Sequence, residues 1–268
     1  MYSVYEILRD NWLLLLVGQY PSGPLGGIVA TLILSVLGIV LAFPLSVLLA
    51  LARLSPWRLL RWPATVLVYV VRGVPLLMVI LWVYFLVPIL IGREVSGFTT
   101  MLCTLVIYEG AYLSEVVRAG ILSLPKGQAE AARALGHSHL GTMWFVILPQ
   151  ALYNMLPSML SQFISTIKET TLGYVINVQE LTFAANQINN QLLTKPFQVF
   201  FILALTYYVV CFSLTQLAQW LERRIAHKRL GAVAAPGGAG AATFPGSPVP
   251  PASAVSAVPP VPPVATLP

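Results

Sequence analysis

The chain has 268 residues, of which 57% are hydrophobic and only 9% are charged, and its net charge is +6. Soluble domains have about a quarter of their residues charged, so this composition excludes an ordinary soluble protein and indicates one embedded in a lipid bilayer. The positive charge does not indicate a nucleic-acid partner, because the cations lie at the ends of apolar segments and not in a basic patch with exposed aromatic residues. We therefore expect an all-α membrane protein.

Long apolar segments follow one another along the chain. The first, expected over residues 28–52, is uncharged and long enough to cross a hydrocarbon core of about 30 Å. Pro44 lies inside it and predicts a kink, since membrane helices tolerate proline. The second apolar region, residues 63–91, is interrupted by the sequence RGVP at residues 72–75. It is either one long kinked helix or an interfacial helix followed by a shorter span that begins near Pro75.

Three further spans complete the pattern, over residues 98–122, from about Thr142 onwards, and over residues 197–221. The cations divide unequally between the two ends of these about five spans, and the end with more of them is expected to be cytoplasmic. One end holds Arg53, Arg58, Arg61, Arg118, Lys126, Arg133, Arg223, Arg224, Lys228 and Arg229, and the other holds Arg9, Arg93 and Lys195. This asymmetry predicts an N-terminus outside and a cytoplasmic C-terminus.

The domain organisation follows from these segments. Residues 1–25 are expected to be an extracytoplasmic segment, and residues 26–229 the membrane domain. Residues 230–268 carry no charge and consist largely of Ala, Pro, Gly, Val and Ser, so they cannot bury a core and are expected to form a disordered tail. Residues 173–196 contain many amide side chains and are expected to lie outside the cell membrane, where they could meet a binding protein.

A polar stretch at residues 108–150 stands between two of the spans. Pro125 is expected to break the preceding helix, because it lacks an N–H group, and residues 128–135 then form a run of good helix formers rich in alanine. Gly136 is placed to end that run in a left-handed conformation, and a second segment begins at His137. The sequence predicts a helix, a sharp turn and a second helix on the polar side of the membrane.

This stretch resembles a known family. The triplet EAA at residues 130–132, followed by Gly136 and by VILP at residues 146–149, is similar to the EAA loop in the membrane-spanning subunits of bacterial ABC importers. The segment from Glu109 to Gln128 is similar to the permeases for polar amino acids in particular, and the likeness covers about residues 25–229. The resemblance implies the type I ABC importer transmembrane fold in a bacterial inner membrane. It also implies that residues 123–145 are a coupling loop that docks on an ATPase through Gln128, Glu130, Ala131, Ala132, Gly136 and His137.

The same resemblance implies the partners of the chain. They are two ATPase subunits, a second permease that is identical or homologous, an extracytoplasmic solute-binding protein, the amino-acid substrate and the membrane lipid. The sequence contains no Gly-x4-Gly-Lys-Ser/Thr phosphate loop, so ATP and its Mg²⁺ are expected on a separate subunit. We expect no cofactor, no metal site and no catalytic residue in this chain, and no nucleic-acid partner.

Lys168 and Glu169 are candidates for the substrate pathway. Adjacent residues on a helix point about 100° apart, so these opposite charges cannot simply neutralise each other, and charges within a membrane indicate function. An amino acid offers a carboxylate for Lys168 and an ammonium group for Glu169, although the pair could instead cap a helix at the outer water interface. A polar stripe precedes them, for which hydrogen bonds between helices are the alternative explanation. The full candidate set is Glu109, Gln162, Ser165, Lys168, Glu169, Thr170 and Thr171, and the stripe also includes Ser158 and Ser161.

Four further residues are candidates for structural or gating roles. Glu115 and Arg118 are three residues apart, so they share a helical face and are expected to form an ion pair. Arg72 and Pro75 belong to the RGVP element, and the cost of a charge at the bilayer centre places Arg72 near water or protein.

The substrate class rests on resemblance alone. Residues 75–88, PLLMVILWVYFLVP, are more similar to acidic than to basic amino-acid permeases, which favours glutamate or aspartate, with glutamine as a close rival. A different class, an ion-coupled secondary transporter with Glu109 as the carrier, commonly has internal repeats, and none is found here. A membrane enzyme is not supported, because the sequence has no nucleophile-elbow or HExxH motif.

Overall fold

The structure is a computed structural model that describes residues 4–233. The chain divides into two units, Met1–Arg224 and Ile225–Pro268, and the first contains every element treated below except the last residues of α10. The tail expected over residues 230–268 falls almost entirely outside the described residues. The helices are α1 (Val4–Val17), α2 (Gly27–Leu54), α3 (Arg58–Gly73), α4 (Leu76–Ile91), α5 (Gly97–Leu122), α6 (Lys126–Ala134), α7 (His139–Gly141), η1 (Thr142–Ile147), α8 (Leu148–Glu169), η2 (Thr170–Ile176), α9 (Leu181–Leu192) and α10 (Pro196–Val233).

Two long helices, α2 and α5, form the centre of the fold. They pack against each other more extensively than any other pair of elements, and α5 then packs against α8. Small residues allow this close approach, as expected for helices in a membrane. A Cβ atom added at Gly110 would lie 2.8 Å from a side-chain carbon of Leu45 in α2. Around this contact Leu34, Met101 and Leu105 are fully buried, so the α2–α5 pair is the frame on which the other elements are placed.

The spans agree with the sequence in part. Within the described residues three helices are long and apolar enough to cross a membrane, namely α2, α5 and the Pro196–Trp220 part of α10, and the pair α3 and α4 makes a fourth if it is one broken span. The helix α8 does not pass the same test, so the total of about five spans remains a prediction.

The second apolar region is broken sharply. The axes of α3 and α4 differ by 106°, so a single kinked helix over residues 63–91 is wrong. Gly73 ends α3, and Val74 is extended with φ −105° and ψ 136°, because a residue before proline is disfavoured in the helical region. Pro75 then begins α4 without needing a backbone hydrogen bond of its own.

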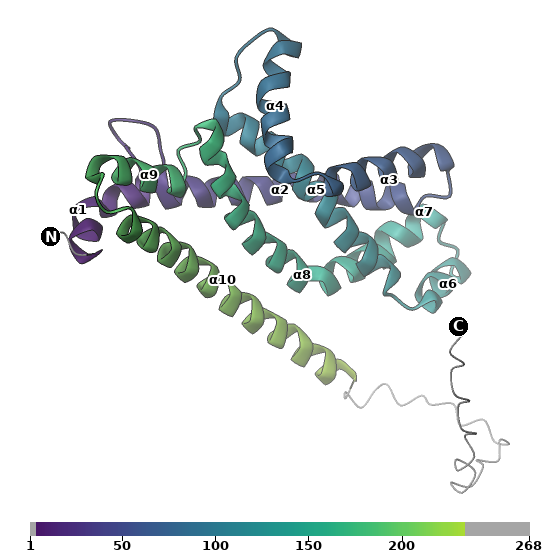
Figure 1. Ribbon diagram of the computed structural model, residues 1–268. Helices are drawn as coiled ribbons and strands as arrows, with labels where there is room; N and C mark the ends of the chain where they lie inside the picture. Colours follow the sequence, from purple (N-terminus) through teal and green to yellow (C-terminus); the bar gives the residue numbers. More distant parts are fainter. Residues whose placement is uncertain (1–3, 234–268) are drawn as a thin grey trace, which may run out of the picture. The chain divides into compact units, whose positions relative to one another are not determined.

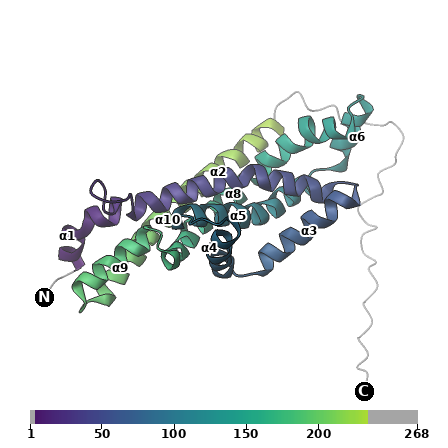
Figure 2. The same ribbon diagram turned by 90° about the horizontal axis from the view of Figure 1, so that it is seen from above.

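The polar segments lie at opposite ends of the α2–α5 pair. Figures 1 and 2 both place α1 and α9 at the end where α2 begins, and α6 at the other end. At the end that contains α1 and α9, the backbone N–H of Gly27 at the start of α2 donates a hydrogen bond to the carbonyl of Gln179, before α9, at 3.1 Å. This separation agrees with the prediction that residues 123–145 and residues 173–196 face different sides of the membrane.

The residues around Glu180 join three helices at the α9 end. Its carboxylate caps α9 by accepting bonds from the backbone N–H groups of Thr182 (2.8 Å) and Phe183 (3.0 Å). The hydroxyl of Tyr207 in α10 donates to the same carboxylate at 3.0 Å, and the backbone N–H of Leu181 donates to the hydroxyl of Thr31 in α2 at 3.1 Å. Glu180 is fully buried, so its carboxyl group joins α9 to α10 away from water, while the bond between Leu181 and Thr31 joins α9 to α2.

This carboxyl group gives the stability of the fold a pH dependence. Burial raises the pKa of Glu180 from 4.5 to about 7, so between these values the folded chain holds a proton that the unfolded chain has released. Stability therefore falls as pH rises through this window. We expect the melting temperature of the wild type, followed by tryptophan fluorescence, to fall over this range relative to the Glu180→Gln variant, which has no titrating group there. A difference between the two proteins that stays constant with pH would contradict this.

Candidate functional site

The loop expected over residues 123–145 folds as a helix, a tight turn and a second helix. The turn after α6 contains the glycine singled out in the sequence, because Gly136 has φ +90°. The N–H of Gly136 donates to the carbonyl of Arg133 at 3.0 Å, and the N–H of His137 donates to the carbonyl of Ala132 at 3.2 Å. These two bonds form a Schellman motif, which satisfies the last carbonyls of α6. The predicted left-handed glycine is confirmed.

The loop presents nearly all of its side chains to its surroundings. Within α6 only Ala132 is buried, and the other predicted coupling residues, Gln128, Glu130, Ala131 and His137, are exposed or nearly so. Leu135 at the tip is 84% exposed and Leu140 is 71% exposed. Large apolar side chains exposed on an otherwise polar loop are typical of a surface that contacts another protein.

A short irregular segment connects this loop to α8. The hydroxyl of Ser138 accepts a bond from the N–H of Gly141 at 3.1 Å and so starts α7. The next segment, η1, is π-helical, a rare form that is frequently found at functional sites and that the sequence pattern did not predict. Leu140 and Trp144 line a cavity of about 290 Å³ together with the end of α2.

A group of carboxyl and amide side chains lies between α5 and α8. Glu109, near the middle of α5, is fully buried, and the side-chain amide of Gln162 in α8 donates to its Oε2 atom at 2.9 Å. Glu169 lies seven residues beyond Gln162 and so on the same face of α8. The structure therefore brings two of the predicted pathway residues, Glu109 and Gln162, together.

Lys168 lies on a different side of α8. It lines a cavity of about 310 Å³ between α8 and α10, whose lining also includes Ser161, Ser165 and Glu222. The polar stripe predicted on α8 is therefore divided, since Gln162 faces α5 while the two serines face α10. Separate partners for Lys168 and Glu169 remain a prediction.

The two threonines that follow are used locally. The hydroxyl of Thr170 donates to the carbonyl of Ile167, and that of Thr171 donates to the carbonyl of Lys168, each at 2.7 Å. Both bonds satisfy carbonyl groups where α8 changes into η2. These hydroxyls help to fix the end of α8 beside Glu169.

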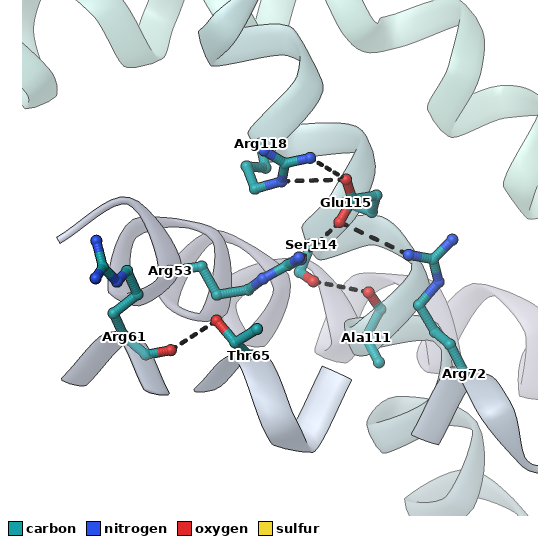
Figure 3. A network of polar contacts seen from close by, with 8 residues as sticks. All are labelled: Arg53, Arg61, Thr65, Arg72, Ala111, Ser114, Glu115 and Arg118. Carbon is teal, nitrogen blue, oxygen red and sulfur yellow. Dashed lines mark hydrogen bonds and ion pairs between the residues drawn. The ribbon is translucent and has the colours of Figure 1, made fainter. Parts of the chain in front are cut away.

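Three arginines converge on Glu115 (Figure 3). Arg53 in α2 donates to Glu115 Oε2 at 2.7 Å, Arg72 in α3 lies 3.6 Å from the same oxygen, and Arg118 pairs with Oε1. Arg53 also lies over the Tyr69 ring, 5.8 Å from its centroid. The predicted pair of Glu115 and Arg118 is confirmed, and it is one part of a network that joins α2, α3 and α5.

The network reaches the break between α3 and α4. The guanidinium of Arg72 lies 5.1 Å from the centre of the Tyr112 ring, and the hydroxyl of Tyr112 donates to the Arg72 carbonyl at 3.5 Å. Arg72 is therefore lined by protein, as predicted, and it ties the residues before Pro75 to α5. The sequence indicated Arg53 only as a cytoplasmic cation, and its part in this network was missed.

The geometry can be compared with known proteins. Residues 42–227 match the family described as the binding-protein-dependent transport system inner membrane component. This chain belongs to that family. The permease is 38% identical over 200 residues to a probable glutamine ABC transporter permease protein of Bacillus subtilis, GlnP, covering 74% of this chain and 91% of the relative. It is 35% identical over 215 residues to a glutamate/aspartate import permease protein of Escherichia coli, GltK, covering 77% and 96%.

A solved structure agrees with this assignment. The permease resembles the chain in a crystal structure of an amino acid ABC transporter with histidines, with a TM-score of 0.72, 30% identity, and coverage of 84% of this chain and 99% of that one. The permease is thus an amino-acid ABC importer permease with the type I transmembrane fold. The ion-coupled transporter considered from the sequence is replaced by this assignment.

Proposed function

We propose that this permease forms the membrane pathway of an importer for polar amino acids, together with a second permease that is identical or homologous. Two separate ATPase subunits dock on residues 123–145, and an extracytoplasmic binding protein delivers the substrate at the α9 end. The location is a bacterial inner membrane. Glutamate and aspartate are the first substrates to test, and glutamine is the second.

The observation that carries this proposal is the coupling loop. Its glycine turn follows a short helix whose predicted docking residues, apart from the buried Ala132, are exposed, and Leu135 at its tip is 84% exposed. Apolar side chains gathered on one exposed surface are typical of protein contacts, and both Leu135 and Leu140 are exposed on this loop. The sequence has no phosphate loop, which supports ATP hydrolysis on that other protein.

Two connections lead from the loop into the membrane domain. On one side α5 continues to the loop and carries Glu115 and Glu109. On the other side η1 joins the loop to α8, which carries Gln162, Lys168 and Glu169. Movement of α6 by closing ATPase subunits would therefore shift α5 and α8 relative to each other. The charged side chains between and beside these two helices are the parts of the pathway that such a shift would rearrange.

The choice of acidic substrates rests on similarity. GltK, at 35% identity, is named for glutamate and aspartate, and GlnP, which is slightly more similar at 38%, is named for glutamine. The cavity lined by Lys168 adds one cation that could meet a substrate carboxylate, and its size of about 310 Å³ lies in the range of small-molecule sites.

The test is uptake by reconstituted vesicles. Permease, ATPase subunits and binding protein are placed in liposomes with ATP inside, and labelled glutamate, aspartate, glutamine and cystine are supplied outside. We expect ATP-dependent accumulation of glutamate or aspartate that needs the ATPase subunits. Accumulation without them would contradict the proposed coupling, and accumulation of glutamine without glutamate would reject the acidic substrates alone.

A further inference from the structure

An apolar cavity lies where α2 ends, beside the start of α3. It has a volume of about 290 Å³ and is lined by Leu54 of α2, Leu60 of α3 and Trp144 of η1, among others. Its polar side chains are those of Ser55 and His139. The cavity is therefore largely hydrocarbon-like inside and polar only at a few points, which suits an apolar group attached to a polar one.

The end of α2 reaches the headgroup layer of a bilayer. This helix has 28 residues and is therefore about 42 Å long, whereas the hydrocarbon core is about 30 Å thick. Its last residues, which line the cavity, thus lie at the boundary between hydrocarbon and headgroups. This is the end that carries Arg53, Arg58 and Arg61, and the excess of cations assigns it to the cytoplasmic leaflet.

The first turns of α3 have the chemistry of a membrane-surface anchor. In the segment WRLLRW, Trp57 and Trp62 are 70% and 72% exposed. Arg58 and Arg61 are also exposed, and they share a helical face because they are three residues apart. Tryptophan is enriched at the boundary between membrane and water, and arginine there attracts anionic headgroups. Since Leu60 lies between the two arginines in the sequence and lines the cavity, cations and cavity are neighbours.

The charges of these two arginines are not used within the fold. Every ion pair found in the part of the chain that the structure describes involves Asp10 or Glu115, and none includes Arg58 or Arg61. The bond at Arg61 uses its backbone carbonyl, which accepts from the hydroxyl of Thr65 at 2.7 Å (Figure 3). The two guanidinium groups are therefore available to an anionic partner, and the membrane surface beside them offers one.

A lipid fits this place better than the other candidate, an apolar side chain of an ATPase subunit. Beyond the cavity α3 exposes large apolar side chains along its length, with Leu59 at 88%, Tyr69 at 65% and Val70 at 57%. An apolar surface that continues along a whole helix from the cavity suits hydrocarbon chains, because a protein docked at one end leaves the rest uncovered. Leu135, at the tip of the coupling loop, is not part of the cavity lining.

We propose that the cavity and the two arginines form a binding site for a phospholipid with an anionic headgroup. One acyl chain enters the cavity between α2, α3 and η1, and the headgroup phosphate lies at Arg58 and Arg61. Because η1 connects the coupling loop to α8, the bound chain joins that connection to the end of α2. One arginine near an anionic surface contributes about fivefold in affinity, so an anionic lipid binds at least about fivefold more tightly than a zwitterionic one.

The site is tested by fluorescence quenching in the assembled importer, without ATP or uptake. Importers with and without Trp144→Phe are placed in phosphatidylcholine vesicles that contain a small fraction of phosphatidylglycerol or phosphatidylcholine with brominated chains, and the difference between the two proteins gives the quenching of Trp144. We expect phosphatidylglycerol to quench Trp144 at about a fivefold lower fraction. This preference should disappear in Arg58→Gln/Arg61→Gln and persist in Arg223→Gln, which removes an exposed cation of α10.

Trp82 in α4 is the matched reporter. It is 60% exposed, against 50% for Trp144, and it lines an apolar cavity without a charged residue. Its quenching, obtained from Trp82→Phe, should not depend on the headgroup. This comparison leaves all the arginines in place, so it decides the matter even if the double arginine variant does not assemble.

Several results would overturn the site. One is equal quenching of Trp144 by the two lipids, and another is the same preference at Trp82, which would indicate general accumulation of anionic lipid. A preference that survives the loss of both arginines overturns it as well. Protection of Trp144 from both lipids would show that an ATPase subunit, and not a lipid, fills the cavity.

Discussion

The Gly136→Asp variant is expected to lose ATP-driven uptake while it still inserts and assembles with its partners. Gly136 has φ +90°, where a side chain is strained, and its two hydrogen bonds close the turn after α6. A residue with a side chain costs about 1–2 kcal/mol in a left-handed conformation, and loss of the motif also frees carbonyls of α6. If the docked loop must keep this turn, a cost of about 1–2 kcal/mol corresponds to a loss of about 5- to 30-fold in affinity for the ATPase. Substrate-stimulated ATPase activity and uptake measure the effect.

Gly127 provides the matched control. Neither glycine has a neighbouring atom within 4 Å of an added Cβ, so both sites have room for a side chain. Only Gly136 has a positive φ, whereas Gly127 lies in the first turn of α6, where an aspartate is favourable. Gly127→Asp should therefore transport nearly as well as the wild type. Equal activity of the two variants would show that the turn conformation is not what couples the subunits.

The parts of the fold that local chemistry decides could be predicted. The third span was expected over residues 98–122 and is found as Gly97–Leu122, because an apolar run begins after the loop and ends before Pro125. The turn at Gly136 was predicted for the same reason, since glycine after a run of helix formers is a local signal. The ion pair of Glu115 and Arg118 could be predicted from their spacing alone, because residues three apart share a helical face.

The other contacts could not be predicted, because they join residues that are far apart in the sequence and meet only in the folded chain. Arg53 and Glu115 are 62 residues apart and meet only because α2 packs on α5. The polar stripe on α8 is continuous by helical spacing, yet Gln162 bonds to Glu109 of α5, whereas Ser161 and Ser165 line a cavity on the α10 side. The proline at residue 75 predicted a kink or a break, and the choice between them was made by where α3 packs, which is against α2 and α5.

Removal of the carboxylate at Glu115 is expected to produce the largest loss of stability. In Glu115→Gln the three guanidinium groups of Arg53, Arg72 and Arg118 lose their only anion among the described residues and repel each other. Breaking a buried ion pair on one side costs about 3–5 kcal/mol. Glu115 is 27% exposed, so the low end, about 3 kcal/mol, is expected. Thermal unfolding of the assembled permease measures it, and Glu94→Gln, in the exposed loop, should leave stability unchanged.

The arginine that remains buried decides how much of this loss can be recovered. The side chain of Arg53 is only 6% exposed, whereas that of Arg118 is 32% exposed. Most of the cost in Glu115→Gln therefore comes from leaving Arg53 charged and unpaired away from water. Adding Arg53→Gln should restore a large part of the lost stability, while adding Arg118→Gln should restore little, because water already reaches that guanidinium. Equal recovery in the two double variants would mean that mutual repulsion of the arginines, and not burial of one of them, makes Glu115 necessary.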